Sequence, residues 1–222
     1  MKENNNSLEL LTPDNSVVTL IDHQPQMFFG VYSHERLGII NNAVALAKAA
    51  KLFNVPVVLS TVAAETFSGE LIPEIQAVFP DQKAIDRTNM NAWEDSNYKA
   101  AIAATGRKKI VLAGLWSEVC VAFPTLSAIR DGYEVYVVAD ACGDISLEAH
   151  ERAFQRAMQA GAVPMTAMQV GFEWQRDWAR SETYDGMMDI LIKHTAYGIG
   201  VRYGKWALGL NASEAGKTAA HA

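Results

Sequence analysis

The chain has 222 residues, of which 50% are hydrophobic and 20% charged, and its formal net charge is -6 at pH 7. This apolar content can form a core without disulfides or metals, and the length suits one large domain. The acidic balance argues against nucleic acid and anionic membranes as partners, and no apolar run approaches the roughly 20 residues that span a bilayer. The first six residues lack the apolar stretch of a signal peptide, and two cysteines make no disulfide framework, so a cytoplasmic protein is expected.

Short apolar runs alternate with helical patterns along the chain. After a polar lead-in at 1–14, strands are expected at 17–21, 55–61, 84–88, 109–113, 133–139 and 162–166. Helices are expected at 36–53, 98–105, 117–130, 146–160, 169–178 and 184–193. This alternation predicts a three-layer α/β/α domain over 15–195, with a six-stranded parallel sheet of Rossmann-like topology. Residues 196–222 are expected to form a C-terminal extension whose end is disordered.

The segment 108–129 organises the rest of the chain. Its apolar strand breaks at Gly114 and re-enters as a helix, for which Ser117 is the expected N-cap. Cys120 then lies near the third helical position, where unpaired backbone N–H groups and the helix dipole favour a thiolate. A nucleophilic role is one interpretation. The other is packing, because free cysteine is often buried.

Two further side chains with chemistry follow strands of the predicted sheet. Asp22 comes directly after the first strand and Arg87 follows the third. The carboxyl ends of parallel strands lie along one edge, so both are expected near Cys120. Asp22 would accept the thiol proton, and Arg87 would hold Asp22 and keep the thiolate ionised. Taken alone, Asp22 is equally well read as a helix-capping group.

Four segments, at 20–24, 86–93, 113–124 and 177–178, resemble the isochorismatase-like cysteine hydrolases, and most of all their bacterial YcaC-type subgroup. The resemblance implies an Asp–Lys–Cys triad, which falls on Asp22, Arg87 and Cys120. It also implies a cis peptide at Trp116–Ser117 and an oxyanion hole made by the N–H groups of Val119 and Cys120. Arg87 departs from the family's usual lysine. Because arginine stays protonated, it can orient Asp22 but cannot carry a proton.

The same resemblance bears on metals and substrate contacts. The family's nicotinamidase branch binds zinc through residues after the second strand, but 61–67 contains no histidine, so neither a catalytic metal nor a cofactor is predicted. The histidines His34, His150, His194 and His221 are assigned to the surface or to capping. Candidate substrate-binding residues, each with packing or backbone binding as the alternative, are Gln24, Phe28, Asn91, Trp93, Trp116 and Phe123.

These features predict a cysteine hydrolase that cleaves an amide or carbamoyl-like C–N bond of a small molecule through an acyl-enzyme on Cys120. Two alternatives stay open. One is a ligand-binding or redox-responsive protein with a low-pKa Cys120. The other is an isochorismatase that hydrolyses a vinyl ether. The resemblance also implies a homo-oligomer, from dimer to octamer, with the stripe 187–191 and the tail after 195 as candidate interfaces.

Overall fold

The structure is a computed structural model that describes residues 8–208, apart from the side chains of Arg202 and Lys205. The predicted lead-in therefore lies partly outside the described residues, as do the end of the C-terminal extension and His221. Within residues 8–208, no helix is long and apolar enough to cross a membrane.

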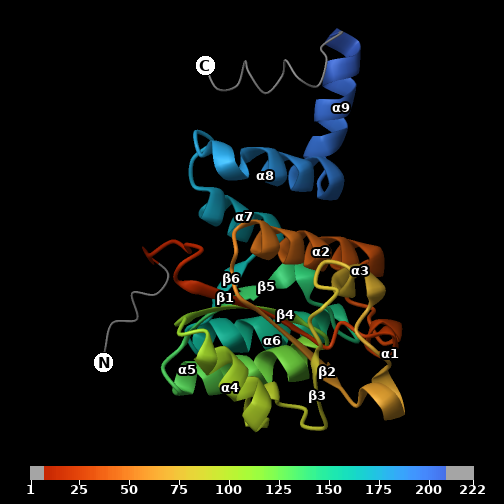
Figure 1. Ribbon diagram of the computed structural model, residues 1–222. Coiled ribbons are helices and arrows are strands. Elements are labelled where there is room, and N and C mark those ends of the chain that lie inside the picture. Colours follow the sequence, from red (N-terminus) through yellow and green to blue (C-terminus); the bar gives the residue numbers. More distant parts are fainter. Residues whose placement is uncertain (1–7, 209–222) are drawn as a thin grey trace.

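The predicted six-stranded, fully parallel sheet is confirmed, with strand order β3-β2-β1-β4-β5-β6 (Figure 1). Its strands are β1 (Ser16–Ile21), β2 (Val57–Val62), β3 (Ile85–Arg87), β4 (Lys109–Gly114), β5 (Glu134–Val138) and β6 (Val163–Met165). The central strands β1 and β4 are buried at every position. This explains why they are apolar almost throughout, since helices cover both faces of a parallel sheet.

Helices flank the sheet on both sides. Figure 1 shows α4, α5 and α6 on one face and α2 and α7 on the other, with α8 stacked outside α2. The helices are α1 (Pro25–Phe29), α2 (Arg36–Leu52), α3 (Pro73–Gln76), α4 (Ser96–Ala104), α5 (Ala122–Arg130), α6 (Leu147–Gln159), α7 (Ala167–Gln175), α8 (Ser181–His194) and α9 (Tyr197–Leu208). The three-layer arrangement matches the prediction.

The order of the strands creates a switch point between β1 and β4. The chain winds outward from β1 through β2 to β3, then returns to β4 on the other side of β1 and winds outward again. The loops that leave β1 and β4 therefore diverge, and in open α/β sheets this crevice at the carboxyl ends is where ligands bind. Asp22 directly follows β1, and Cys120 lies just beyond β4.

Three predictions about elements are corrected. The helix expected to start at Ser117 is instead a single five-residue π-helical turn, Ser117–Val121, which leads into α5, and Ser117 caps nothing. The C-terminal extension after 195, for which no helix was predicted, contains α9. The stripe at 187–191 is no candidate interface, because Met187, Ile190 and Leu191 are buried within the chain.

Candidate active site

Asp22 lies at the centre of the candidate site, with its side chain fully buried. It is the first residue after β1 and adopts a left-handed backbone conformation with φ of 58°. Its N–H donates to Ser60 O at 2.9 Å, so the β1–β2 ladder continues through this residue. Non-glycine residues rarely adopt positive φ, although aspartate tolerates it better than most, and such strain gathers at functional sites.

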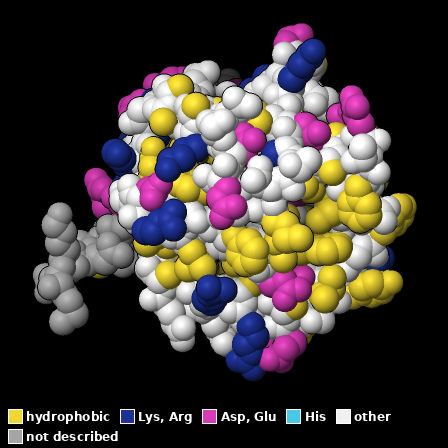
Figure 2. Space-filling model, turned by 90° about the horizontal axis from the view of Figure 1, so that it is seen from below, with side chains coloured by type: hydrophobic (Ala, Val, Ile, Leu, Met, Phe, Trp, Pro, Cys, Tyr) yellow, Lys and Arg dark blue, Asp and Glu magenta, His cyan; other side chains and the backbone are white. Residues whose placement is uncertain are grey.

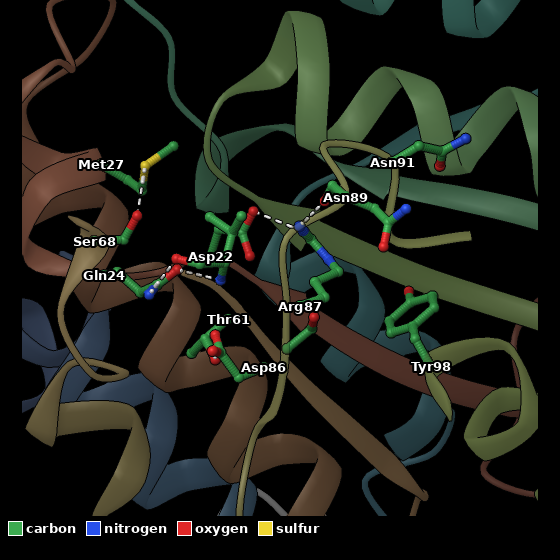
Figure 3. A network of polar contacts seen from close by, with 12 residues as sticks. Asp22, Gln24, Met27, Thr61, Ser68, Asp86, Arg87, Asn89, Asn91 and Tyr98 are labelled. Carbon is green, nitrogen blue, oxygen red and sulfur yellow. Dashed lines mark hydrogen bonds and ion pairs between the residues drawn. The ribbon is translucent and has the colours of Figure 1, made fainter. Parts of the chain in front are cut away.

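Arg87 reaches Asp22 across the end of the intervening strand β2. It is the last residue of β3, and its Nη2 donates to Asp22 Oδ2 at 2.7 Å, with both side chains fully buried. Its Nη1 donates to Asn89 O in the loop that follows (Figure 3). Asp22 Oδ1 and Arg87 Nε are buried without hydrogen-bond partners. The predicted meeting of these two side chains is therefore observed, and it leaves one carboxylate oxygen of Asp22 unpaired.

Cys120 lies in the turn Ser117–Val121, which we call the thiol turn, and it is almost fully buried. Burial raises the pKa of its thiol, and the negative charge of Asp22 raises it further. The Arg87 guanidinium and a backbone contact with Trp116 lower it, but by less. The prediction of a thiolate kept ionised by the helix start and Arg87 is thus wrong for the resting site, because desolvation outweighs both effects.

The pKa of Asp22 is also raised, from 3.8 to about 6. Burial is the largest cause, while Arg87 and the thiol of Cys120 hold the value down. The thiol of Cys120 lies close enough to lower the pKa of Asp22. It forms no regular hydrogen bond to Asp22 Oδ1, which has no partner. At neutral pH the resting site therefore pairs a protonated thiol with an ionised carboxylate able to accept its proton.

The backbone around the thiol turn differs from prediction in two ways. The cis peptide is Leu115–Trp116, one bond before the expected Trp116–Ser117. The N–H of Val119, expected to face an oxyanion, donates to Trp116 O at 3.1 Å. An oxyanion role for Val119 therefore requires this contact to open.

Gln24 and Asn91, both predicted to bind substrate, are occupied with backbone or neighbouring side chains. The Gln24 amide accepts from Val62 N at 2.9 Å and donates to Val62 O at 3.2 Å and to Gly69 O. Asn91 accepts from Trp93 N at 3.1 Å and donates to two further side chains. The structural alternative, which is to fix the loops after β2 and β3, is therefore observed for both side chains, and substrate binding by them stays a prediction.

The four aromatic residues predicted to bind substrate lie in different surroundings. Trp93 is buried under Tyr98 and Tyr133 and donates to Asp131, so it belongs to the packing around α4 and α5. Trp116 adjoins the thiol turn, and its Nε1 donates to Met27 O at 2.8 Å, which ties the turn to α1. Phe28 is a buried residue of α1, and Phe123 is half-buried in α5.

Residues that sequence reasoning passed over also surround the site. Tyr98 donates to or accepts from Thr19 at 3.0 Å, and it lies near enough to Asp22 and Arg87 for their charges to act on its pKa. Figure 3 shows its ring beside Arg87. In the sequence, Tyr98 is one apolar position of an amphipathic helix, so no signal separates it from core packing.

Two histidines are buried beside the site. His23 Nε2 contacts Ala141 O at 3.0 Å, and burial lowers the pKa of His23 to about 4. His150 was assigned to the surface or to capping, but it is buried against the thiol turn, where its Nδ1 lies 2.8 Å from Ser117 Oγ. Among the described residues, no group of three or more His, Cys, Asp and Glu side chains is placed to hold a metal ion.

Comparison with known proteins gives consistent matches. A family model described as "Isochorismatase domain" matches residues 16–169. The "Probable hydrolase YcaC" of Escherichia coli is 40% identical over 185 residues, which cover 83% of this chain and 88% of that protein.

Two solved structures agree with this match. The YcaC gene product of Escherichia coli, described as an octameric hydrolase of unknown specificity, aligns with a TM-score of 0.85 and 38% identity over 90% of this chain and 97% of its own. YcaC from Pseudomonas aeruginosa, with hexane-2,5-diol and covalent acrylamide, aligns with a TM-score of 0.84 and 36% identity over 88% of this chain and 96% of its own.

Proposed function

This chain belongs to the isochorismatase-like hydrolase family, and we propose that it cleaves a carbon–nitrogen bond of a small amide or carbamoyl-like molecule with Cys120 as nucleophile. One observation carries the proposal. The buried ion pair of Asp22 and Arg87 lies at the switch point of the sheet and acts on the thiol of Cys120. A carboxylate beside a protonated thiol is the arrangement that general-base activation of a nucleophile requires.

The reaction has two stages. Cys120 Sγ attacks the carbonyl carbon while Asp22 takes the thiol proton, and the C–N bond breaks as Asp22 passes that proton to the leaving amine. Asp22 then removes a proton from a water molecule that attacks the thioester, and the thiol is restored. The sum is amide plus water giving acid plus amine. Because the thiol pKa is raised at rest, proton transfer accompanies attack rather than preceding it.

Arg87 supports both stages without exchanging a proton. Its guanidinium remains charged at all working pH values and holds Asp22 Oδ2 by a 2.7 Å contact. This contact leaves Oδ1 as the oxygen that faces the chemistry. It also stabilises the ionised form of Asp22, which would otherwise be protonated in so buried a position.

The solved relative from Pseudomonas aeruginosa contains covalent acrylamide. Acrylamide alkylates thiols at its vinyl carbon and not at its carbonyl, so this adduct supports a reactive nucleophile in the family but not a particular class of cleaved bond. The two alternative functions find less support. The raised pKa of the Cys120 thiol weighs against a redox role that depends on a low pKa. Isochorismate carries two carboxylates, which would need cationic partners in the site. The buried guanidinium of Arg87 is already bound to Asp22 and Asn89, so it does not serve as such a partner.

A panel of small amides, carbamates and isochorismate tests this function. Turnover of a neutral amide is expected for the wild-type chain and should be lost in Cys120→Ala. The matched control is Cys142→Ala, which removes the other buried, free cysteine and should retain turnover. Amide turnover that survives in Cys120→Ala, or hydrolysis of isochorismate alone, would overturn the proposal.

We also propose that the chain forms a cytoplasmic homo-oligomer. Its two cysteines are free, which fits a reducing compartment.

Large hydrophobic side chains are exposed after the ends of β1, β2 and β3, at Phe29, Phe67 and Met90. Figure 2 shows hydrophobic side chains gathered in a band across one face of the molecule. Exposed apolar patches of this kind mark interaction surfaces, and the Escherichia coli relative is octameric.

A further inference from the structure

The thiol turn is held at its first residue by a different part of the chain. Ser117 is fully buried, and its N–H and Oγ both donate to Gly143 O, at 3.0 and 3.1 Å. The next residue, Glu118, donates its N–H to Asp144 Oδ2 at 2.7 Å. The position of Cys120, three residues after Ser117, therefore depends on the loop between β5 and α6.

His150, in the first part of α6, completes this anchor. Its Nδ1 lies 2.8 Å from Ser117 Oγ. Ser117 Oγ also lies 3.1 Å from Gly143 O, so this hydroxyl lies between a carbonyl and the imidazole, and the tautomer of His150 determines which atom of the Ser117–His150 pair donates. Packing fixes the ring, which stacks on Phe154 with centroids 4.5 Å apart and meets the His34 ring edge-on at 4.6 Å. Burial lowers the pKa of His150 to about 4, so the imidazole is neutral at working pH.

We propose that His150 is a positioning residue for the reaction: it hydrogen-bonds to Ser117 and thereby aligns the thiol of Cys120 with Asp22. The inference rests on the proposed role of Cys120 as nucleophile. A hydrocarbon side chain would fill the space between Phe154 and His34 equally well. What only a hydrogen-bonding group at this place supplies is the contact with Ser117 Oγ, which fixes the rotation of the turn that carries the sulfur.

Two substitutions of His150 separate alignment from packing. His150→Leu keeps much of the volume but forms no hydrogen bond, whereas the side-chain amide of His150→Asn can place its nitrogen or its oxygen where Nδ1 lies. The readout is the second-order rate of Cys120 alkylation by iodoacetamide, followed by peptide mass spectrometry, together with the melting temperature. We expect about a tenfold slower rate in His150→Leu, the scale of one buried hydrogen bond, and a rate within about threefold of wild type in His150→Asn.

His194→Leu is the matched control. His194 also hydrogen-bonds through its ring, to Asn41 and Lys48, but from α8 on the far side of α2. Its removal should leave the alkylation rate unchanged. If His150→Leu does not fold, Ser117→Ala removes the other partner of the same bond, with Ser117→Thr as its rescue, and the same tenfold and threefold limits apply.

The outcomes are distinct. A His150→Leu variant that alkylates at the wild-type rate, with only its melting temperature lowered, would overturn the positioning role and leave a packing role. Equal slowing in His150→Leu and His150→Asn would overturn it as well. Failure of wild-type Cys120 to react at all would instead overturn the proposed function on which this inference rests.

Discussion

At the scale of single residues, burial decides the protonation states. Asp22 and Cys120 are shielded from water, so desolvation raises both pKa values, and Arg87 only partly offsets this for Asp22. The pair therefore rests as carboxylate and thiol, and the thiol gives its proton to Asp22 as the sulfur attacks. A carboxyl pKa of about 6 suits a general base, because a base is most effective when its pKa lies near the working pH.

The pKa of Asp22 leads to a prediction for the pH profile. Since this carboxyl titrates at about 6 and only its ionised form accepts a proton, the turnover rate should fall as pH decreases through about 6. The measurement is kcat/KM from pH 4.5 to 8. Asp22→Asn should lower the rate by about 10²–10⁴-fold, the range for loss of a general base, and abolish this inflection. An inflection that persists in Asp22→Asn would assign it to another group.

Arg87 should control the position of that inflection. Arg87→Met leaves the buried carboxylate of Asp22 without its cation, so the pKa of Asp22 should rise and the inflection should move above pH 6. Arg87→Lys keeps a cation and should shift it less. Lys109→Met is the control, because Lys109 is another buried cation, paired with Glu134, but it lies at the first residue of β4. An unmoved inflection in Arg87→Met would contradict this role.

At the scale of elements, the close approach of β1 and β4 brings the two reacting side chains together. Gly114 ends β4 opposite Ile21, and a Cβ added there would lie 2.7 Å from Ile21 O. Gly114→Ala should therefore separate the strands, lower stability by about 1–3 kcal/mol as overpacking does, and slow alkylation of Cys120. Gly38→Ala is the control, because a Cβ on this exposed helical residue meets nothing within 4 Å. Its free energy of unfolding should not fall.

Chemical denaturation with parallel alkylation of Cys120 measures both glycine variants. Equal stability and equal reactivity of Gly114→Ala and the wild-type chain would show that the strands tolerate a side chain at this position. Glycine would then not be required at the end of β4.

The strands were predictable from the sequence because residues buried on both faces make apolar runs such as that of β1. Their shared carboxyl edge then brought Asp22 and Arg87 together by topology alone. The thiol turn was not predictable, because its geometry depends on contacts with Gly143 and His150, which are distant in the sequence. Loop amides such as Gln24 look the same in a sequence whether they bind backbone or substrate.

Helix α9 escaped prediction for a different reason. Gly198, Gly200 and Gly204 lower the helical propensity of this segment, yet the structure is helical there. The direction of the Cys120 pKa was also mispredicted. Helix position can be estimated from a pattern, but the depth of burial that determines desolvation comes only from the packed fold.

At the scale of the whole molecule, exposed hydrophobic side chains should be covered by further copies of the chain. Light scattering on the eluted protein should give an even multiple of the 24.3 kDa chain mass. Phe67→Asp places a charge on an exposed apolar side chain and should shift the mass toward the single chain. A wild-type mass of 24.3 kDa at micromolar concentration would contradict assembly.

The most direct test of the account is to trap the acyl-enzyme. A slowly hydrolysed activated amide or ester of a small neutral acid is mixed with the wild-type chain, quenched in acid and digested for mass spectrometry. The account predicts an acyl group on the peptide that contains Cys120, lost in Cys120→Ala and formed far more slowly in Asp22→Asn. Turnover without any adduct on Cys120, or an adduct only on Cys142, would contradict it.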